Sequence, residues 1–322
     1  MRLKLVPSLT KIDFFRRSYI PLGGSIIAMI VSVILFAVVG LNYGIDFRGG
    51  TTIRTESTQA VDVSAYRDAL QSLDLGDVSI TEVFDPNFAA DKHVTQVRIE
   101  QQEGSESVTS ETILAIENAL QGFDPNIKFP SVESVGPKVS GELIQTAVLA
   151  VVLAISAVLI YIWLRFEWQF SVGAVAALVH DVVLTIGIFS ILQIKFDLAI
   201  IAAILTIVGY SLNDTVVVFD RVRENLRKYK KLDLREVLNL SINETLSRTV
   251  MTSVTTLIAL ISLFILGGDV IRGFVFAMIW GVIVGTYSSV FVASNILLRL
   301  GVKRDWSNSD PSAGTQFANV DA

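Results

Sequence analysis

The chain has 322 residues, of which 52% are hydrophobic and 18% are charged, and its mean hydropathy is +0.57. A water-soluble protein of this length has no core large enough to bury so many apolar side chains. The net charge of −5 contains no basic excess, which argues against a nucleic-acid partner. The lack of cysteine excludes disulfides and thiolate metal sites, and two histidines cannot form a histidine-rich metal cage. We therefore expect a membrane protein with no metal and no cofactor.

Six apolar runs of the sequence are long enough to cross a bilayer. A hydrocarbon core about 30 Å thick requires about 20 mostly apolar residues in a helix. One such run lies near the N-terminus, a long polar segment follows it, and five further runs come close together. The first run is longer than the roughly 7–15-residue apolar region of a signal peptide and has no small-x-small cleavage site. We therefore expect it to be a retained anchor.

The distribution of Lys and Arg sets the expected orientation. Six spans place both termini on one side, and most basic residues of the chain fall on that side. The short loops on the opposite side carry only Lys195 and Arg272. By the positive-inside rule, the termini are cytoplasmic. The predicted organisation is a cytoplasmic N-terminus at 1–17, spans at 18–41, 142–164, 168–193, 197–219, 249–267 and 271–298, a periplasmic domain at 42–141, a cytoplasmic loop at 220–248 and a cytoplasmic tail at 299–322.

The polar segment after the first span is typical of a small α+β domain. Predicted strands cover 51–55, 78–84, 93–100 and 127–135, and predicted helices begin at the caps Asp62 and Ser110, the first ending at Gly76, with a turn at 85–87. The order strand–helix–strand–strand–helix–strand is the ferredoxin-like pattern. The sequence thus predicts a polytopic α-helical membrane protein of six transmembrane helices, with this extracytoplasmic domain between the first two. The domain is of a binding or coupling type, and His93 is interpreted as an ordinary strand residue.

The fourth span contains an acidic residue, Asp214. It lies about 10 Å above the cytoplasmic edge at 1.5 Å per residue, counted from Arg221. A charged aspartate at the centre of a transmembrane helix costs roughly 2.5–3.5 kcal/mol, and less toward the edge. We expect Thr206, Tyr210 and Asn213 to share its helical face and to give it hydrogen-bonding partners.

The fifth span begins next to Arg248, which we expect to be the positively charged partner of Asp214. A series of hydroxyl side chains follows it, and such a helix suits a polar seam or a water chain: Thr249, Thr252, Ser253, Thr255 and Thr256. Two hypotheses remain open for the pair. Asp214 and Arg248 either form a proton or cation relay, or they form a static ion pair that only holds two helices together.

His180 and Asp181 lie near the middle of the third span. Adjacent residues of a helix point about 100° apart, so we expect the two side chains to face different partners. One interpretation is a packing role with hydrogen bonds to neighbouring helices. The other is membership of the relay, or of an interface with another membrane subunit.

Two further patterns concern packing. Gly281 and Gly285 form a G-x-x-x-G stripe on the sixth span, which allows close helix contact within the chain or with a partner. Residues 233–247 are predicted to form a cytoplasmic amphipathic helix at the membrane interface.

The sequence contains neither a phosphate-binding P-loop nor a dinucleotide-binding glycine motif. It also lacks a zinc-protease motif, and the serine, histidine and aspartate residues of the third span are not interpreted as the catalytic set of an intramembrane hydrolase. We therefore expect that the protein is not an enzyme and that its energy source is not its own ATP hydrolysis.

Several stretches of the sequence resemble the SecF members of the bacterial SecD/SecF family of protein-export subunits, within the RND superfamily. They are residues 44–51 (GIDFRGGT), 133–137 (ESVGP), 180–181 (HD), 208–214 (VGYSLND), 220–225 (DRVREN) and 247–249 (SRT). The resemblance implies half of an RND-type bundle in the bacterial inner membrane, paired with SecD. It also implies a role at the SecYEG translocon, where the pair uses an ion gradient to promote late translocation of preproteins.

The resemblance also implies roles for individual residues. It places ion conduction on Asp214 and Arg248, with H⁺ or Na⁺ as the coupling ion. It places the exit motif of the first span on Asp46, Gly49, Gly50 and Thr51. YajC and YidC are further candidate partners.

Two other functions are compatible with the sequence. The chain could be a structural scaffold, in which case neutral, shape-preserving changes at Asp214 are harmless and bulky changes at Gly281 or Gly285 disperse the complex. It could also be half of an RND-type exporter of small lipophiles. Such exporters usually carry much larger outward domains.

Overall fold

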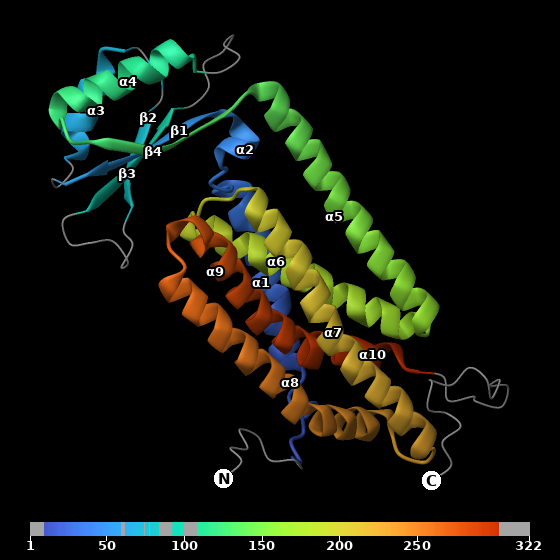
Figure 1. Cartoon of the computed structure of the whole chain (residues 1–322). Coiled ribbons are helices and arrows are strands. Elements are labelled where there is room, and N and C mark those ends of the chain that lie inside the picture. The colour runs from blue at the N-terminus through green and yellow to red at the C-terminus, as the bar shows by residue number, and fades with distance from the viewer. Residues whose placement is uncertain are drawn as a thin grey trace, which may run out of the picture.

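The structure is a computed structural model that describes residues 10–58, 62–73, 75–76, 78–83, 92–99 and 108–302. Within these residues, six long apolar helices form a bundle, and a small α+β domain lies at one end of it (Figure 1). The bundle helices are α1 (Tyr19–Val38), α5 (Pro137–Arg165), α6 (Trp168–Leu192), α7 (Leu198–Lys228), α8 (Leu234–Leu266) and α9 (Asp269–Ser288), which continues through the π-helical segment η1 (Ser289–Ala293) into α10 (Ser294–Leu300).

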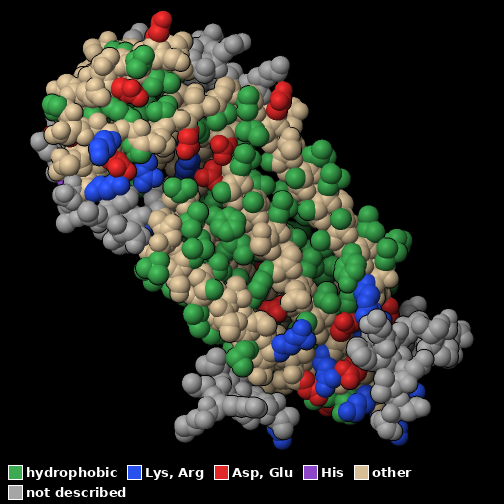
Figure 2. All heavy atoms as spheres, in the orientation of Figure 1, with side chains coloured by type: hydrophobic (Ala, Val, Ile, Leu, Met, Phe, Trp, Pro, Cys, Tyr) green, Lys and Arg blue, Asp and Glu red, His purple; other side chains and the backbone are tan. Residues whose placement is uncertain are grey.

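The surface of the bundle is apolar along its middle and charged at its ends (Figure 2). Large exposed apolar side chains lie along the outer helices, for example Ile27 on α1, Leu153 on α5 and Ile258 on α8. Such faces suit contact with lipid, because the hydrocarbon core offers no hydrogen bonds and no charge solvation. The predicted architecture of six spans and a small domain is confirmed.

The domain contains a short helix, α2 (Ile45–Arg48), and the elements β1 (Gly50–Ser57), α3 (Val63–Gln71), β2 (Val78–Val83), β3 (His93–Ile99), α4 (Ser110–Phe123) and β4 (Lys128–Val135). The antiparallel sheet has the order β2-β3-β1-β4, so the ferredoxin-like prediction is confirmed. Helices α3 and α4 cover one face of the sheet (Figure 1), and the core between them includes Ile53, Tyr66, Val97, Ile116 and Leu120. The predicted turn at 85–87 lies outside the described residues.

The two domain helices begin at side-chain caps. Asp62 accepts a hydrogen bond from the backbone N–H of Ser64 at 2.9 Å, as the sequence predicts. The second cap is Thr109, whose hydroxyl accepts from the backbone N–H of Thr112 at 3.2 Å. The predicted cap Ser110 is therefore wrong by one residue, and Ser110 is the first helical residue.

Two details of the domain differ from expectation. Helix α3 ends at Gln71, before the predicted end at Gly76, because the chain must turn early for Leu75 to enter the domain core. His93 does lie on a strand, and its Nδ1 is 3.6 Å from the carboxylate of Glu82 on the neighbouring strand.

The predicted cytoplasmic loop at 220–248 is largely helical. Helix α7 continues to Lys228, and α8 begins at Leu234 behind the cap Asp233. The predicted helix at 233–247 is present as the first turns of α8, and it continues into the fifth span because no glycine or proline interrupts the sequence between them. Figure 1 shows the first turns of α8 lying across the end of the bundle before the helix turns along it.

Candidate functional site

Asp214 lies on the buried side of α7. Its side chain is 4% exposed, and Oδ2 has no hydrogen-bond partner among the described residues. The hydroxyl of Tyr210, one turn earlier, is also buried without a partner. The predicted hydrogen bonds from Thr206 and Asn213 to Asp214 are wrong. The Thr206 hydroxyl donates to the backbone carbonyl of Ala202 in its own helix, and Asn213 is exposed. A buried carboxyl without partners costs free energy, and such groups in membranes usually have a function.

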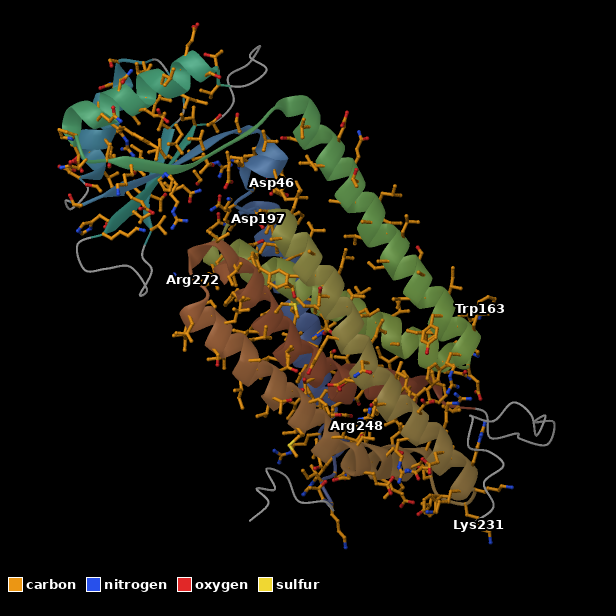
Figure 3. All side chains as sticks on the ribbon, viewed as in Figure 1. Asp46, Trp163, Asp197, Lys231, Arg248 and Arg272 are labelled. Atoms are coloured by element: carbon orange, nitrogen blue, oxygen red, sulfur yellow. The ribbon has the colours of Figure 1, made fainter. Side chains whose placement is uncertain are left out.

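Arg248 supplies the positive charge that acts on Asp214. The two groups do not form an ion pair, because no carboxylate oxygen of Asp214 is within 4.0 Å of the guanidinium nitrogens. Arg248 is exposed and lies toward the end of the bundle away from the domain (Figure 3). In this structure the static ion pair is therefore absent, and the two groups remain close enough to interact through their charges.

The hydroxyl side chains after Arg248 mostly bond to their own helix. The hydroxyls of Thr252, Thr255 and Thr256 each donate to a backbone carbonyl of α8. Ser253 bonds across the bundle to Thr286 of α9 at 2.7 Å. The Thr249 hydroxyl is buried and, among the described residues, has no hydrogen-bond partner, as is the case for the Tyr210 hydroxyl and Asp214 Oδ2 of α7.

Asp181 is the centre of a second buried polar cluster. Its Oδ1 is 2.9 Å from His180 Nδ1, and its Oδ2 accepts from Ser211 at 2.6 Å and from Ser288 at 2.8 Å. His180 and Asp181 are 0% and 1% exposed. The two side chains contact each other, because rotation about the side-chain bonds brings the imidazole to the carboxylate. Apart from this contact they have different partners, as the sequence predicts, since Asp181 bonds to Ser211 and Ser288 whereas His180 stacks on Tyr287. Asp181 thereby joins α6 to α7 and to α9.

The cluster extends to α1 through Tyr287. The Tyr287 ring stacks on His180, with ring centroids 6.0 Å apart. Its hydroxyl donates to the carbonyl of Pro21 at 2.8 Å and lies 3.1 Å from the hydroxyl of Ser25. Because Nε2 of His180 has no partner among the described residues, one polar atom of this cluster remains unsatisfied.

Gly281 and Gly285 bring α9 against α7. A Cβ on Gly281 would lie 2.3 Å from a side-chain carbon of Ile207, and a Cβ on Gly285 would lie 3.0 Å from Ser211 Cβ. The glycine stripe is therefore used for packing within the chain. It also leaves room for Ser211 to reach Asp181.

The segment after α1 joins the domain to the bundle. Backbone hydrogen bonds of 2.8 Å link Gly44 to Phe196 and Phe196 to Asn42. The carboxylate of Asp46 accepts from the backbone N–H of Leu198, the first residue of α7, at 3.0 Å. Negative charge is favourable at this helix end. Asp46 thus connects the domain directly to the helix that carries Asp214, and Figure 3 shows it beside the bundle end.

The two glycines of the predicted exit motif turn the chain from α2 into β1. Gly49 and Gly50 have φ values of 74° and 113°, which side-chain-bearing residues rarely adopt. Thr51 follows as a fully buried residue of β1, and its hydroxyl is 2.8 Å from that of Ser134 on β4.

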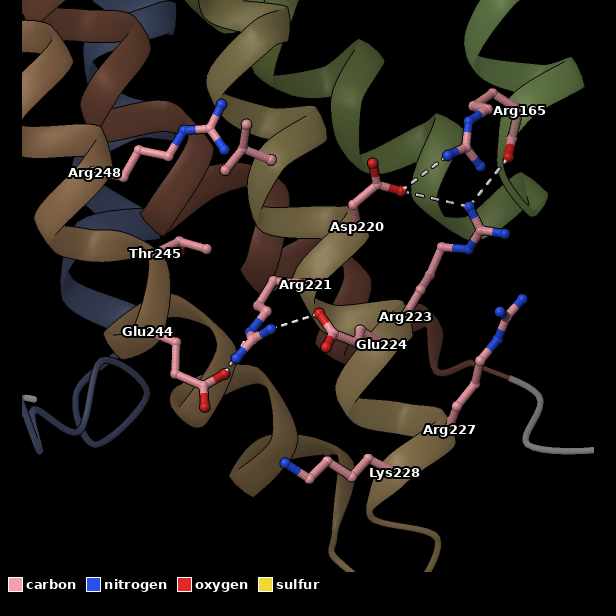
Figure 4. Close-up of a pocket in the computed structure, with 11 residues that line it drawn as sticks. Arg165, Asp220, Arg221, Arg223, Glu224, Arg227, Lys228, Glu244, Thr245 and Arg248 are labelled. Carbon is pink, nitrogen blue, oxygen red and sulfur yellow. Dashed lines mark hydrogen bonds and ion pairs between the residues drawn. The ribbon is translucent and has the colours of Figure 1, made fainter. Parts of the chain in front are cut away.

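A cavity of about 910 Å³ opens beside Arg248, between the end of α5, the last turns of α7 and the first turns of α8 (Figure 4). We name it the basic cavity. Its lining consists of Arg165, Val217, Asp220, Arg221, Arg223, Glu224, Arg227, Lys228, Glu244, Thr245 and Arg248.

Sequence reasoning did not find this cavity. The basic residues between 221 and 228 are recognisable in the sequence, but on their own they indicate only the orientation of the chain in the membrane. The cavity depends on how far α5 leans from the bundle, which no local pattern encodes.

Comparisons with known proteins give consistent results. The model of the family "Protein export membrane protein SecD/SecF, C-terminal" matches residues 115–303, and the SecD/SecF GG motif matches residues 34–61. The protein translocase subunit SecF of Cereibacter sphaeroides is 64% identical over 321 residues, covering 100% of this chain and 99% of the relative. The protein translocase subunit SecDF of Brucella abortus is 42% identical over 98% of this chain and 41% of its own.

A solved structure agrees in fold. The crystal structure of SecDF from Thermus thermophilus, described as a translocon-associated membrane protein, has a TM-score of 0.82 and 34% sequence identity. The match covers 93% of this chain and 40% of the SecDF chain.

Proposed function

The chain belongs to the SecD/SecF family of protein export membrane proteins, and on this premise we propose that it couples an ion gradient to the late translocation of preproteins. SecD is the proposed second half of the complex, and the SecYEG translocon is the proposed site of action. Asp214 and Arg248 are the proposed ion-relay residues.

A second half is supported by the relatives that carry both parts in one chain. This chain matches 41% of the Brucella abortus SecDF and 40% of the Thermus thermophilus SecDF, so most of each relative lies outside the match. The outer face of α7 carries exposed Gly209 and Asn213 in the middle of an apolar helix, which favours a protein neighbour over lipid. Co-purification from detergent tests the pairing: SecD should be present in equal amount, and isolation of this chain alone from cells that make both would contradict it.

The observation that carries the relay is the buried, unpartnered carboxyl of Asp214 near a cation that is not locked to it. A carboxyl in apolar surroundings favours its neutral, protonated form, and an approaching guanidinium favours the ionised form. Movement of α8 relative to α7 would therefore bind and release an ion. One charge crossing 100 mV releases about 2.3 kcal/mol, which is sufficient to bias such a movement.

The proposed location is the inner membrane, with residues 42–141 periplasmic and both termini cytoplasmic. The basic side chains at the ends of α5 and α7 and the start of α8 support this orientation through the positive-inside rule. The link from Asp46 to Leu198 supports a mechanical path from the relay helix to the periplasmic domain. YajC and YidC are proposed as accessory partners.

Two substitutions test the relay. Asp214→Asn and Arg248→Met should each abolish the gradient-dependent part of preprotein export in vesicles that contain SecD and SecYEG, while the ATP-driven part continues. The reason is that neither variant can alternate between a neutral and an ionised pair. Asp68→Asn, which neutralises an exposed carboxyl of the domain, is the matched control and should export at the wild-type rate.

Normal gradient-dependent export in both relay variants would falsify the relay and favour a scaffold. Assembly with SecD, measured by co-purification of each variant, should be unchanged. This second readout separates loss of the relay from loss of the complex.

A further inference from the structure

The basic cavity carries more positive than negative charge. Five arginines and one lysine line it together with three carboxylates, which gives a formal excess of three positive charges. Two of the three carboxylates already form ion pairs with a lining residue, because Arg221 is 2.5 Å from Glu224 and 2.7 Å from Glu244. The positive excess therefore comes from the other basic side chains of the lining, which are Arg165 on α5, Arg223, Arg227 and Lys228 on α7, and Arg248 on α8, with Asp220 as their only carboxylate in the lining.

Two of these guanidinium groups share one carboxylate. Arg165 and Arg223 are 3.5 Å and 3.6 Å from the same oxygen of Asp220 (Figure 4). These distances are longer than those of charge-assisted hydrogen bonds, which are about 2.7–2.9 Å. One carboxylate can neutralise only one of the two charges. This part of the lining therefore presents a net positive charge to the cavity.

The two guanidinium groups are held in place without being fully satisfied. Both lie over the ring of Phe166, at 5.4 Å for Arg165 and 5.1 Å for Arg223. Arg223 also donates to the backbone carbonyl of Arg165 at 3.4 Å. Guanidinium groups fixed in this way provide preorganised donors for the oxygens of a phosphate group.

The cavity lies at the depth of lipid headgroups. Trp163 and Trp168 flank the end of α5 and are 66% and 54% exposed. Exposed tryptophans of membrane proteins concentrate at the headgroup level. Beyond them, α5 presents an exposed apolar face that includes Leu153, Ile160 and Leu164. A lipid whose headgroup entered the cavity could lay its acyl chains along this face.

We propose that the basic cavity binds the phosphate headgroup of an anionic phospholipid from the membrane leaflet at this end of the bundle. Arg165 and Arg223 hold the phosphate, and the exposed face of α5 contacts the acyl chains. Arg248 of the proposed relay lines the same cavity, but neither of the two arginines that hold the phosphate belongs to the relay pair.

The experiment measures lipid retention by native mass spectrometry of the full-length protein, purified alone and with SecD. The protein should retain phosphatidylglycerol in preference to phosphatidylcholine. Arg165→Gln combined with Arg223→Gln should weaken phosphatidylglycerol binding at least about tenfold, the size expected for the loss of charge-assisted hydrogen bonds. The matched control combines Arg16→Gln with Arg17→Gln, which removes two exposed charges outside the cavity at the same membrane side and should leave binding unchanged.

A variant with the opposite expected effect distinguishes the loss of lipid contacts from misfolding, because a misfolded protein would not bind the lipid more tightly. Asp220→Asn removes the shared carboxylate and should tighten phosphatidylglycerol binding, because both guanidinium groups are then available to the lipid phosphate. Equal phosphatidylglycerol binding by the wild type and the Arg165 and Arg223 double variant would overturn the proposal. Inorganic phosphate binding as tightly as the lipid, or loss of the lipid when SecD is bound, would also overturn it, since the occupant would then be a free anion or the partner chain.

Discussion

Asp181 and Asp214 are both aspartates buried within helices of the same bundle, but their surroundings differ. Asp181 has partners on both carboxylate oxygens, from α6, α7 and α9. Within the described part of the chain, Asp214 has no hydrogen-bond partner on Oδ2, and Arg248 acts on it through its charge. A buried carboxylate with complete hydrogen bonding holds helices together, whereas an unsatisfied one is free to change its protonation and its partner.

The difference follows from what faces each residue. α9 approaches Asp181 closely because Gly285 has no side chain, so that Ser211 and Ser288 can both reach the carboxylate. Asp214 lies three residues after Ser211, nearer the end where α8 begins and the basic cavity opens. The first carboxylate is thus enclosed by protein on three helices, and the second lies beside a charged, open region.

The largest expected effect on stability is that of Asp181→Ala. The substitution leaves two buried hydroxyls and His180 without their acceptor, and removing one partner of a buried charged network costs about 3 kcal/mol. The free energy of unfolding in detergent, measured by SDS titration, should fall by that amount. Asp214→Asn is the internal control and should change it little, because no hydrogen bond to Oδ2 is lost. An equal loss of unfolding free energy in both variants would contradict the inference that Asp181 is hydrogen-bonded to neighbouring helices and Asp214 is not.

A smaller effect is expected from Gly285→Ala. The new Cβ would lie 3.0 Å from Ser211 Cβ, so Ser211 must shift and its 2.6 Å bond to Asp181 must lengthen. Overpacking of this kind costs about 1 kcal/mol. The same SDS titration should show this loss, and the loss should be smaller in a Ser211→Ala background, where the bond is already absent.

Gly209→Ala is the matched control for that substitution, because its Cβ would meet nothing within 4 Å. It should leave the free energy of unfolding unchanged or slightly raise it through better helix propensity. Purely additive losses for Gly285→Ala and Ser211→Ala would show that the glycine does not act through the cluster around Asp181.

The features that sequence predicted well are those that local pattern encodes. Six spans follow from the length of apolar runs, and the ferredoxin-like order follows from alternation and from caps such as Asp62. The cluster around Asp181 could not be predicted, because it depends on the rotation of three helices and on side-chain reach. The helix at 233–247 was predicted, but its continuation into the fifth span as a single helix was not, because amphipathicity does not reveal whether the backbone continues as one helix. The predicted hydrogen-bonding partners of Asp214 were wrong because Asn213 faces outward.

The smallest expected effect concerns a third carboxylate, Asp13, which is exposed and hydrogen-bonded. It accepts from Asn239 Nδ2, from the backbone N–H of Phe15 and from Arg235, each at 3.0 Å. The hydrogen bond from Asn239, with smaller contributions from Phe15 and Arg235, lowers the pKa of Asp13 below its ordinary value. Because the pKa is lower in the folded state, the contact stabilises the folded segment fully above the ordinary aspartate pKa of about 4. That contribution is lost as the pH falls through the lower folded value.

Hydrogen exchange of residues 10–17 measures this contact. Exchange should be slow at pH 6 and, after correction for the intrinsic rate, faster near pH 3, where the protonated carboxyl accepts hydrogen bonds less strongly. Asp13→Asn should exchange quickly at both pH values, because the neutral amide retains the shape of the carboxylate but not its charge. If both the wild type at low pH and the Asp13→Asn variant kept their protection, packing of Phe14 and Phe15 alone would hold the segment, and the charge of this exposed carboxylate would contribute nothing to it.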